Sequence, residues 1–206
     1  MLTYDFSFLA GREPGIISET VQHVSAVCIP LTEGPEGDMV LFEKRAETLK
    51  HQPGDICFPG GKVENGEKPE EAAVREMMEE LLVEPAQVEI LGPLDILAVG
   101  FSRVHPYACR LRDYHGCFNS PEVDEVFQVP LAFFLETEPE IHEVHWKVEL
   151  GTDFPVEKIH GGRNYPWRER IDRICFYEYG GHVIWGMTAK IMYSFVQLLR
   201  AEERKK

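Results

Sequence analysis

The chain has 206 residues, a formal net charge of −14 at pH 7 and a pI of about 5.0. This length suits one domain with a sizeable hydrophobic core. The excess of negative charge argues against broad binding to nucleic acids or to anionic membranes, because both of these partners are themselves negatively charged.

Cysteine content and the N-terminal sequence bear on the compartment. The five cysteines include no C-x-x-C pair, and an odd number of this kind is typical of reduced thiols in a cytoplasmic protein. The first fifteen residues contain no basic stretch followed by a long apolar run. We therefore expect neither a signal peptide nor a transmembrane span.

The first third of the chain predicts mainly strands. Residues 1–20 are expected to form an N-terminal strap. Residues 22–32 are rich in β-branched and apolar side chains, as in a mostly buried strand, and 39–45 is its predicted hairpin partner. A polar loop over 46–55 leads into a short strand at 56–58.

A helix is predicted to begin at Pro69, because proline lacks the N–H that the first helical residue leaves unpaired. Pro85 follows the predicted helix closely and can stop it. Four apolar residues at three-four spacing form its predicted buried stripe: Val74, Met77, Met78 and Leu81.

The rest of the chain predicts further strands and one long helix. The predicted strands are 88–99 (a pair or one bent strand), 104–112, 125–129, 140–150, 174–179 and 182–185. A helical turn is expected over 131–135 and an exposed loop over 151–172. In the C-terminal helix, within 186–206, one side is expected to carry Ile191, Phe195, Leu198 and Leu199. The predicted fold class is α+β, a mixed sheet flanked by helices in one domain over residues 1–206.

Three glutamates share one face of the helix that begins at Pro69. Glu76, Glu79 and Glu80 have the i, i+3, i+4 spacing that brings side chains together, opposite the apolar stripe. Neighbouring carboxylates repel each other, and a divalent cation among them relieves that repulsion. Such hard oxygen ligands suit Mg²⁺ or Mn²⁺ rather than Zn²⁺. A solvated acidic helix face is the alternative explanation.

The residues around these glutamates favour the metal site. Gly61, five residues, Glu67, seven residues and then REMMEE over 75–80 resemble the signature box of the Nudix hydrolases. Leu82 stands where the box has glycine, whereas every carboxylate position is kept. The resemblance implies the Nudix fold, an α/β/α sandwich, and a hydrolase that acts on diphosphates with Mg²⁺ or Mn²⁺.

The same resemblance implies residue roles. The implied metal contacts are Glu76, Glu79, Glu80, the backbone of Gly61 and, as a weaker candidate, Glu125. One box glutamate is the implied base, with Glu76 favoured over Glu79. Arg75 is expected to pair with a carboxylate and hold its rotamer.

A second stretch resembles the upstream motif of the coenzyme A pyrophosphatase branch of the Nudix family. It runs over 41–61 and ends in FPGG; Lys50 stands where the branch has arginine, and Phe42 and Glu43 replace the usual Leu and Thr. The implied substrate contacts are Lys44, Arg45, Lys50, Gly60 and Gly61. The implied reaction splits coenzyme A or its thioesters into 3′,5′-ADP and 4′-phosphopantetheine or its acyl form.

Two other functions stay open at this point, as does a homodimer. One is a broader nucleoside-diphosphate-X hydrolase that acts on NADH or ADP-ribose, and the other is a catalytically silent Nudix-fold sensor of nucleotides. Some pairs and clusters favour a structural explanation: His142 and His145 would point to opposite faces of a strand, and Cys57 is expected to be packed. The basic cluster of Arg163, Arg168, Arg170 and Arg173 is expected to be a solvated loop, with contact to a 3′-phosphate as the alternative.

Overall fold

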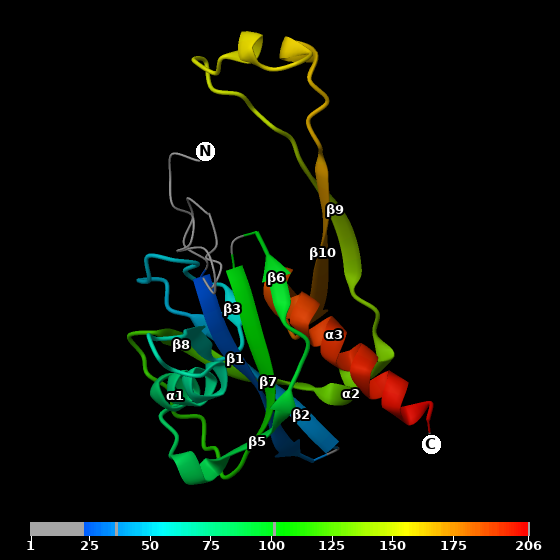
Figure 1. The fold of residues 1–206 in the computed structure, drawn as a ribbon. Helices are drawn as coiled ribbons and strands as arrows, with labels where there is room; N and C mark the ends of the chain where they lie inside the picture. Colours follow the sequence, from blue (N-terminus) through cyan, green and yellow to red (C-terminus); the bar gives the residue numbers. More distant parts are fainter. Residues whose placement is uncertain (1–22, 36, 101, 206) are drawn as a thin grey trace, which may run out of the picture.

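The computed structural model describes residues 23–35, 37–100 and 102–205, so the strap predicted for residues 1–20 lies outside the described residues. Figure 1 shows the arrangement of the elements. The strands are β1 (His23–Gly34), β2 (Gly37–Arg45), β3 (Ile56–Cys57), β4 (Gly60–Lys62), β5 (Val88–Pro93), β6 (Leu97–Val99), β7 (Ser102–Leu111), β8 (Val123–Pro130), β9 (Glu140–Trp146), β10 (Arg170–Tyr179) and β11 (His182–Trp185). The helices are α1 (Pro69–Leu81), α2 (Leu131–Glu136), α3 (Gly186–Glu203) and the 3₁₀ turns η2 (Pro85–Gln87), η3 (Val156–Lys158) and η4 (Gly162–Asn164).

The main sheet is mixed, as predicted. Its strand order is β3-β2-β1-β7-β5, with β8 paired to β2, β4 to β1 and β6 to β7. The central pair β1 and β7 is parallel, and the other pairs are antiparallel. The predicted hairpin is confirmed, with Thr32 opposite Met39.

Helices cover both faces of this sheet, because its central strands are apolar on both sides. Cys28 of β1 and Leu41 of β2 pack with Met77 and Leu81 of α1 in one cluster of buried residues. The adjacent residues in the strands face the other way. Ile29 and Phe42 belong to a second cluster that contains Phe134 of α2 and Ile191, Met192 and Phe195 of α3. The α+β prediction of a sheet between helices is therefore confirmed.

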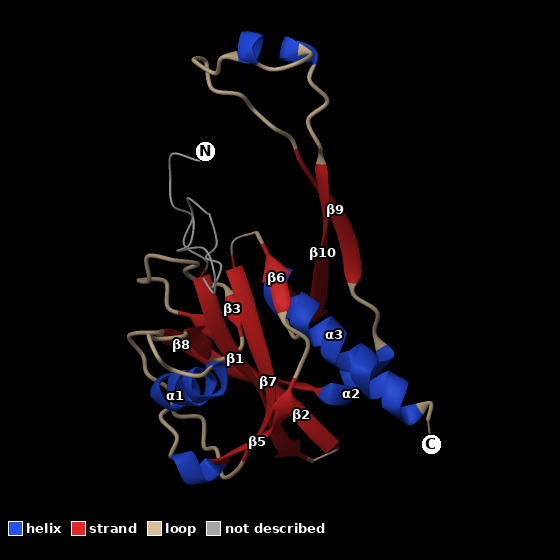
Figure 2. Cartoon of the chain, viewed as in Figure 1, coloured by secondary structure: helices blue, strands red, loops and turns tan. Residues whose placement is uncertain are grey.

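A second, three-stranded antiparallel sheet has the order β11-β10-β9. Its β9–β10 ribbon extends away from the main sheet (Figure 2), and every residue of β9 is exposed. The predicted loop over 151–172 contains the 3₁₀ turns η3 and η4, and β10 already begins at Arg170. The hairpin predicted around Gly180-Gly181 is confirmed by the pairing of Tyr179 with His182.

Helix α1 begins at the predicted Pro69, and the Glu71 carboxylate accepts a hydrogen bond from the Lys68 backbone N–H at 3.1 Å. Its buried face is turned relative to the predicted stripe. The small side chains of Ala72 and Ala73 are buried, whereas Val74 and Met78 are only partly buried. This rotation brings Glu80, which was predicted to lie opposite the apolar stripe, into the buried face.

The end of α1 differs from the prediction that Pro85 stops the helix. Leu82, at the position where the box has glycine, adopts the left-handed conformation itself, with φ 52° and ψ 46°. Left-handed backbone places a side-chain Cβ too close to the next carbonyl oxygen. The helix therefore ends as a glycine-terminated helix does, and the Leu82 backbone is strained by roughly 1–2 kcal/mol.

We expect Leu82→Gly to stabilise the protein. The Leu82 side chain is 59 % exposed, so its removal loses little packing. Relief of backbone strain, less the greater freedom of glycine in the unfolded chain, should leave a gain of about 0.5–1 kcal/mol. Thermal unfolding should show this gain relative to Leu82→Ala, which removes the side chain and keeps the strain. Equal stability of the two variants would contradict the left-handed assignment.

The buried side of α3 agrees only in part with the predicted one. Of the predicted residues, Ile191 and Phe195 are buried, but Leu198 is 42 % exposed because α3 turns Met192 and Val196 toward the core in its place.

The structure also describes the cysteines and the helices that bear on the compartment. All five cysteines are free thiols. None of the helices within the described ranges is both long and apolar enough to cross a membrane.

Candidate active site

The three α1 glutamates lie at different depths. Glu80 is 4 % exposed, and its Oε2 accepts a hydrogen bond from the Gly60 N–H at 2.8 Å. Glu76 is half-buried, whereas the Glu79 side chain is 55 % exposed. The predicted common face is therefore a series of carboxylates that runs from the core at Glu80 to the surface at Glu79.

Arg75 organises the outer part of this series. Its Nε and Nη2 donate to the two carboxylate oxygens of Glu67, at 2.9 and 3.1 Å, and its Nη1 donates to Glu76 at 2.8 Å. Nη2 also donates to the Lys62 carbonyl at 3.2 Å. The expectation that Arg75 pairs with a carboxylate is confirmed. The bidentate contact with Arg75 lowers the pKa of Glu67 and fixes the loop that carries it against α1.

Gly60 and Gly61, the first residues of β4, allow close approach on both sides. A Cβ on Gly61 would lie 2.4 Å from Cδ of Glu76, so the absent side chain leaves the space that the Glu76 carboxyl group fills. A Cβ on Gly60 would lie 2.3 Å from the Ala26 carbonyl oxygen of β1. Gly61 thus admits a functional side chain, whereas Gly60 admits the neighbouring backbone.

Glu43 is a site residue that the sequence prediction missed. It lies on β2, its side chain is fully buried, and it accepts a hydrogen bond from the Cys57 thiol at 3.3 Å. Its Oε2 has no hydrogen-bond partner among the described residues. The alternation in MVLFEKR was the available signal, because it assigns Glu43 to the same face as the buried Leu41.

The buried carboxylates perturb each other. Burial and, to a lesser extent, the charge of Glu43 raise the pKa of Glu80 to about 9. Burial likewise raises the pKa of Glu43 to about 7, although its hydrogen bond from Cys57 opposes this. Burial also raises the pKa of Glu76, against the effect of Arg75. Two interacting buried acids, one of which has an unpaired oxygen, favour protons or a cation at this place.

The donor set fits a divalent cation in type and charge. Glu43, Glu76 and Glu80 offer hard carboxylate oxygens, and the unpaired Oε2 of Glu43 is a free ligand atom. No group of three or more acidic, histidine or cysteine side chains within the described ranges is already arranged around one point. The guanidinium group of Arg75 occupies one oxygen of Glu76.

Three of the predicted contacts are not brought to these carboxylates. Lys44 and Glu125 are opposite each other on β2 and β8, on the same face as the facing pair Phe42 and Phe127, which lies away from α1. Glu125 pairs with His182 Nε2 at 3.2 Å, and Lys44 pairs with the Glu47 carboxylate at 3.3 Å. Strand alternation therefore turns Glu125 away from the metal ligands proposed for α1.

Lys50, the third of these contacts, is exposed on the loop between β2 and β3 and does not line the cleft described next. The two histidines and four arginines considered in the sequence analysis do not form one site either. His142 and His145 each lie beside a glutamate of their own strand, at 3.3 and 3.9 Å. Of the four clustered arginines, only Arg170 and Arg173 line the cleft.

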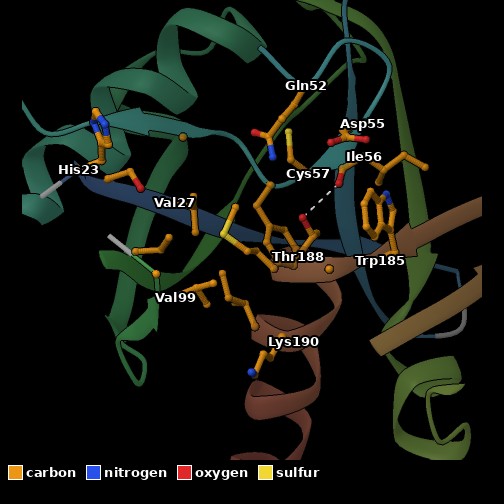
Figure 3. A pocket seen from close by; sticks show the side chains of 18 of the residues that line it. His23, Val27, Gln52, Asp55, Ile56, Cys57, Val99, Trp185, Thr188 and Lys190 are labelled. Carbon is orange, nitrogen blue, oxygen red and sulfur yellow. Dashed lines mark hydrogen bonds between the residues drawn. The ribbon is translucent and has the colours of Figure 1, made fainter. Parts of the chain in front are cut away.

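A cleft of about 900 Å³ lies beside Gly60 and Gly61. Arg45 also lines it, as do residues of β10 and of the start of α3; Figure 3 shows Trp185, Thr188 and Lys190 among the lining residues. The cationic lining residues are Arg45, Lys62, Arg170, Arg173 and Lys190, against the two carboxylates of Asp55 and Asp172. In a chain of net charge −14, this local excess of positive charge is suited to an anionic ligand.

Comparison with known proteins assigns the fold to a family. The model of the NUDIX domain matches residues 21–149, which is more than half of the chain. The chain belongs to the Nudix family. The match contains β4, α1 and Glu43, whereas β10, β11 and α3 lie beyond it.

Curated Nudix proteins are similar over most of the chain. Nudix hydrolase 15, mitochondrial, of Arabidopsis thaliana is 32 % identical over 82 % of this chain and 55 % of that protein. Nudix hydrolase 22, chloroplastic, of the same plant is 30 % identical over 82 % of this chain and 52 % of that protein. The Nudix hydrolase NudL of Klebsiella pneumoniae is 29 % identical over 83 % of this chain and 80 % of that protein. The chain thus spans about half the length of the two Arabidopsis relatives.

Proposed function

We propose that this chain is a metal-dependent Nudix hydrolase that splits the diphosphate linkage of coenzyme A or its thioesters. The products are 3′,5′-ADP and 4′-phosphopantetheine or its acyl form. The observation that carries the proposal is the pair of buried carboxylates, Glu43 and Glu80, which are hydrogen-bonded to two residues of a cleft whose charged lining residues are mostly cationic. Buried like charges of this kind destabilise a fold, so their presence favours a role in binding cations.

In this proposal the metal ligands are Glu76 and Glu80, with Glu43 added and Glu79 at the outer edge. A divalent cation bound there, Mg²⁺ or Mn²⁺, screens the diphosphate charge and acidifies a water molecule. The Gly60 N–H holds Glu80 in place, and Arg75 holds Glu76. Glu76, half-buried with a raised pKa, is our choice for the group that accepts the proton of the attacking water.

The substrate contacts follow from the cleft lining. Arg45, Gly60 and Gly61 line the end nearest the carboxylates, so the diphosphate is expected to lie there. The guanidinium group of Arg45 is suited to bind phosphate oxygens in pairs. The whole chain is treated as one domain in this proposal, because β10, β11 and α3 complete both the cleft and a core cluster that contains β1 and β2. The free thiols support a cytoplasmic protein.

A broader nucleoside-diphosphate-X hydrolase is the second candidate, and one observation favours it. Lys44 and Lys50, two contacts implied by the coenzyme A branch motif, do not line the cleft. Without them, fewer branch-specific residues contact the substrate. NADH and ADP-ribose, which share a nucleoside diphosphate with coenzyme A, would then be accepted comparably well.

A substrate panel tests these proposals. The purified protein is incubated with Mg²⁺ or Mn²⁺ and with coenzyme A, acetyl-coenzyme A, NADH or ADP-ribose, and kcat/KM is measured for each. We expect the highest kcat/KM for coenzyme A or its thioester. A higher value for NADH or ADP-ribose would overturn the coenzyme A assignment and support the broader hydrolase. Tight nucleotide binding without any turnover would support a sensor.

A further inference from the structure

Trp185 stands out among the residues that line the cleft. It is the last residue of β11, lies directly before α3, and is 44 % exposed although it lines a concave site. A tryptophan side chain is seldom this exposed to solvent, since its ring offers a large area for burial. Figure 3 shows its indole ring at the end of the cleft occupied by Asp55 and Ile56.

The position of this indole ring is fixed on one side. Phe176 is its cross-strand partner on β10, and the two rings are stacked with centroids 6.0 Å apart and an interplanar angle of 14°. Just beyond Trp185, the Thr188 hydroxyl donates to the Ile56 carbonyl at 3.1 Å and ties the start of α3 to β3. One face of the indole is thus supported, and its exposed area is available to a ligand in the cleft.

Trp185 shares one cleft with Gly60 and Gly61. The volume of this cleft, about 900 Å³, lies within the range of nucleotide-sized ligand sites. Arg173 and Lys190 line the same cleft and supply positive charge to it. Trp185 lies beyond residue 149, where the match to the family model ends, so this wall of the cleft is not part of the matched Nudix domain.

We propose that Trp185 is the stacking platform for the aromatic base of a nucleotide whose phosphates lie toward Gly60 and Gly61. The inference rests on the proposed function for the identity of the whole substrate. It assigns the nucleoside half to the part of the cleft beside Trp185, so the pantetheine half extends from the diphosphate in another direction. Base–aromatic stacking contributes enough that its removal should weaken nucleotide binding roughly 5- to 150-fold.

The test measures binding of the separate halves, which requires no turnover. Isothermal titration calorimetry gives the Kd of 3′,5′-ADP and of 4′-phosphopantetheine for the unmodified protein and for Trp185→Leu. We expect Trp185→Leu to raise the Kd of 3′,5′-ADP at least about fivefold and to leave the Kd of 4′-phosphopantetheine unchanged. Unchanged affinity for 3′,5′-ADP would overturn the proposal, and so would a loss confined to 4′-phosphopantetheine.

Two matched variants separate stacking from damage to the fold. Trp185→Phe keeps an aromatic face and should restore most of the affinity for 3′,5′-ADP. Trp167→Leu removes an indole that is exposed to a similar degree, 37 %, but does not line the cleft, and it should bind both halves as the unmodified protein does. Failure of Trp185→Phe to bind better than Trp185→Leu would contradict stacking.

Kinetics distinguish this inference from the proposed function. With coenzyme A as substrate, Trp185→Leu should raise KM while kcat changes little, because stacking acts equally on the bound substrate and the transition state. If the protein hydrolyses no member of the panel while Trp185→Leu still weakens the binding of 3′,5′-ADP, the proposed function is wrong and the stacking role of Trp185 is supported. If coenzyme A is hydrolysed with the same KM by both proteins, the platform fails and the proposed function stands.

Discussion

Glu80→Gln should abolish hydrolysis while the fold is kept. Glu80 is the most buried of the α1 glutamates, and the amide of glutamine removes the negative charge that a cation needs. Loss of residues that merely support a metal ligand lowers activity 10- to 100-fold, so we expect a loss of at least about 100-fold for a direct ligand. The measurement is kcat/KM with Mg²⁺ and the preferred substrate of the panel.

The same variant should be more stable than the unmodified protein when metal is removed. The pKa of Glu80 is raised to about 9 in the folded state, from an ordinary value of 4.5. The folded state therefore holds a proton that the unfolded state releases, and the free energy of unfolding falls as pH rises from 4.5 through 9. Glutamine does not titrate, so at pH 8 with EDTA we expect a gain of at most about 5 kcal/mol, which vanishes near pH 4.5.

Glu70→Gln is the matched control for both measurements. Glu70 is an exposed glutamate in the first turn of the same helix, and the substitution changes the net charge by the same amount. It should leave both kcat/KM and the pH dependence of unfolding nearly unchanged. Near-normal turnover in Glu80→Gln would refute the metal assignment, and a loss of stability at pH 8 would contradict the burial of a strained carboxylate.

Gly61→Ala should impair catalysis far more than it impairs stability. The added methyl group would meet the Glu76 carboxyl group, with 2.4 Å between the new Cβ and Cδ. Because the obstructing atoms are the end of a flexible side chain, Glu76 can move aside, and unfolding should become easier by only about 1 kcal/mol. The displaced carboxyl group loses its position beside Arg75, and a shift of about 1 Å lowers activity about 100-fold.

Two neighbouring glycines make this prediction specific. At Gly60 the new Cβ would lie 2.3 Å from the backbone oxygen of Ala26, so Gly60→Ala should destabilise the whole β1–β4 pair. Gly66 has φ +85° and open space around it, so Gly66→Ala should lower stability by about 1 kcal/mol and keep activity. Thermal unfolding and kcat/KM are measured for all three. Normal activity in Gly61→Ala would show that the placement of Glu76 does not matter.

The local periodicity of the sequence was sufficient to predict most of the elements. The apolar pattern of β1 and β2 predicted a hairpin, and Pro69 predicted the first residue of α1, because such signals depend on near neighbours in the chain. Leu82 was the local exception. Its left-handed conformation is unfavourable for leucine and persists because the turn into η2 and β5 follows immediately.

The box spacing by itself determined which glutamates form a candidate metal site and which glycines and arginine accompany them, because helix periodicity brings residues 76, 79 and 80 together whatever surrounds them. Only the tertiary structure determines how deeply these glutamates are buried and that Glu43 lies near them. It also places Lys44 and Glu125 on the opposite face of the sheet and Trp185 in the cleft. These features depend on how α1, β2 and β11 pack. Contacts between elements as much as 125 residues apart, as Gly60 and Trp185 are in one cleft, leave no signal in either local sequence.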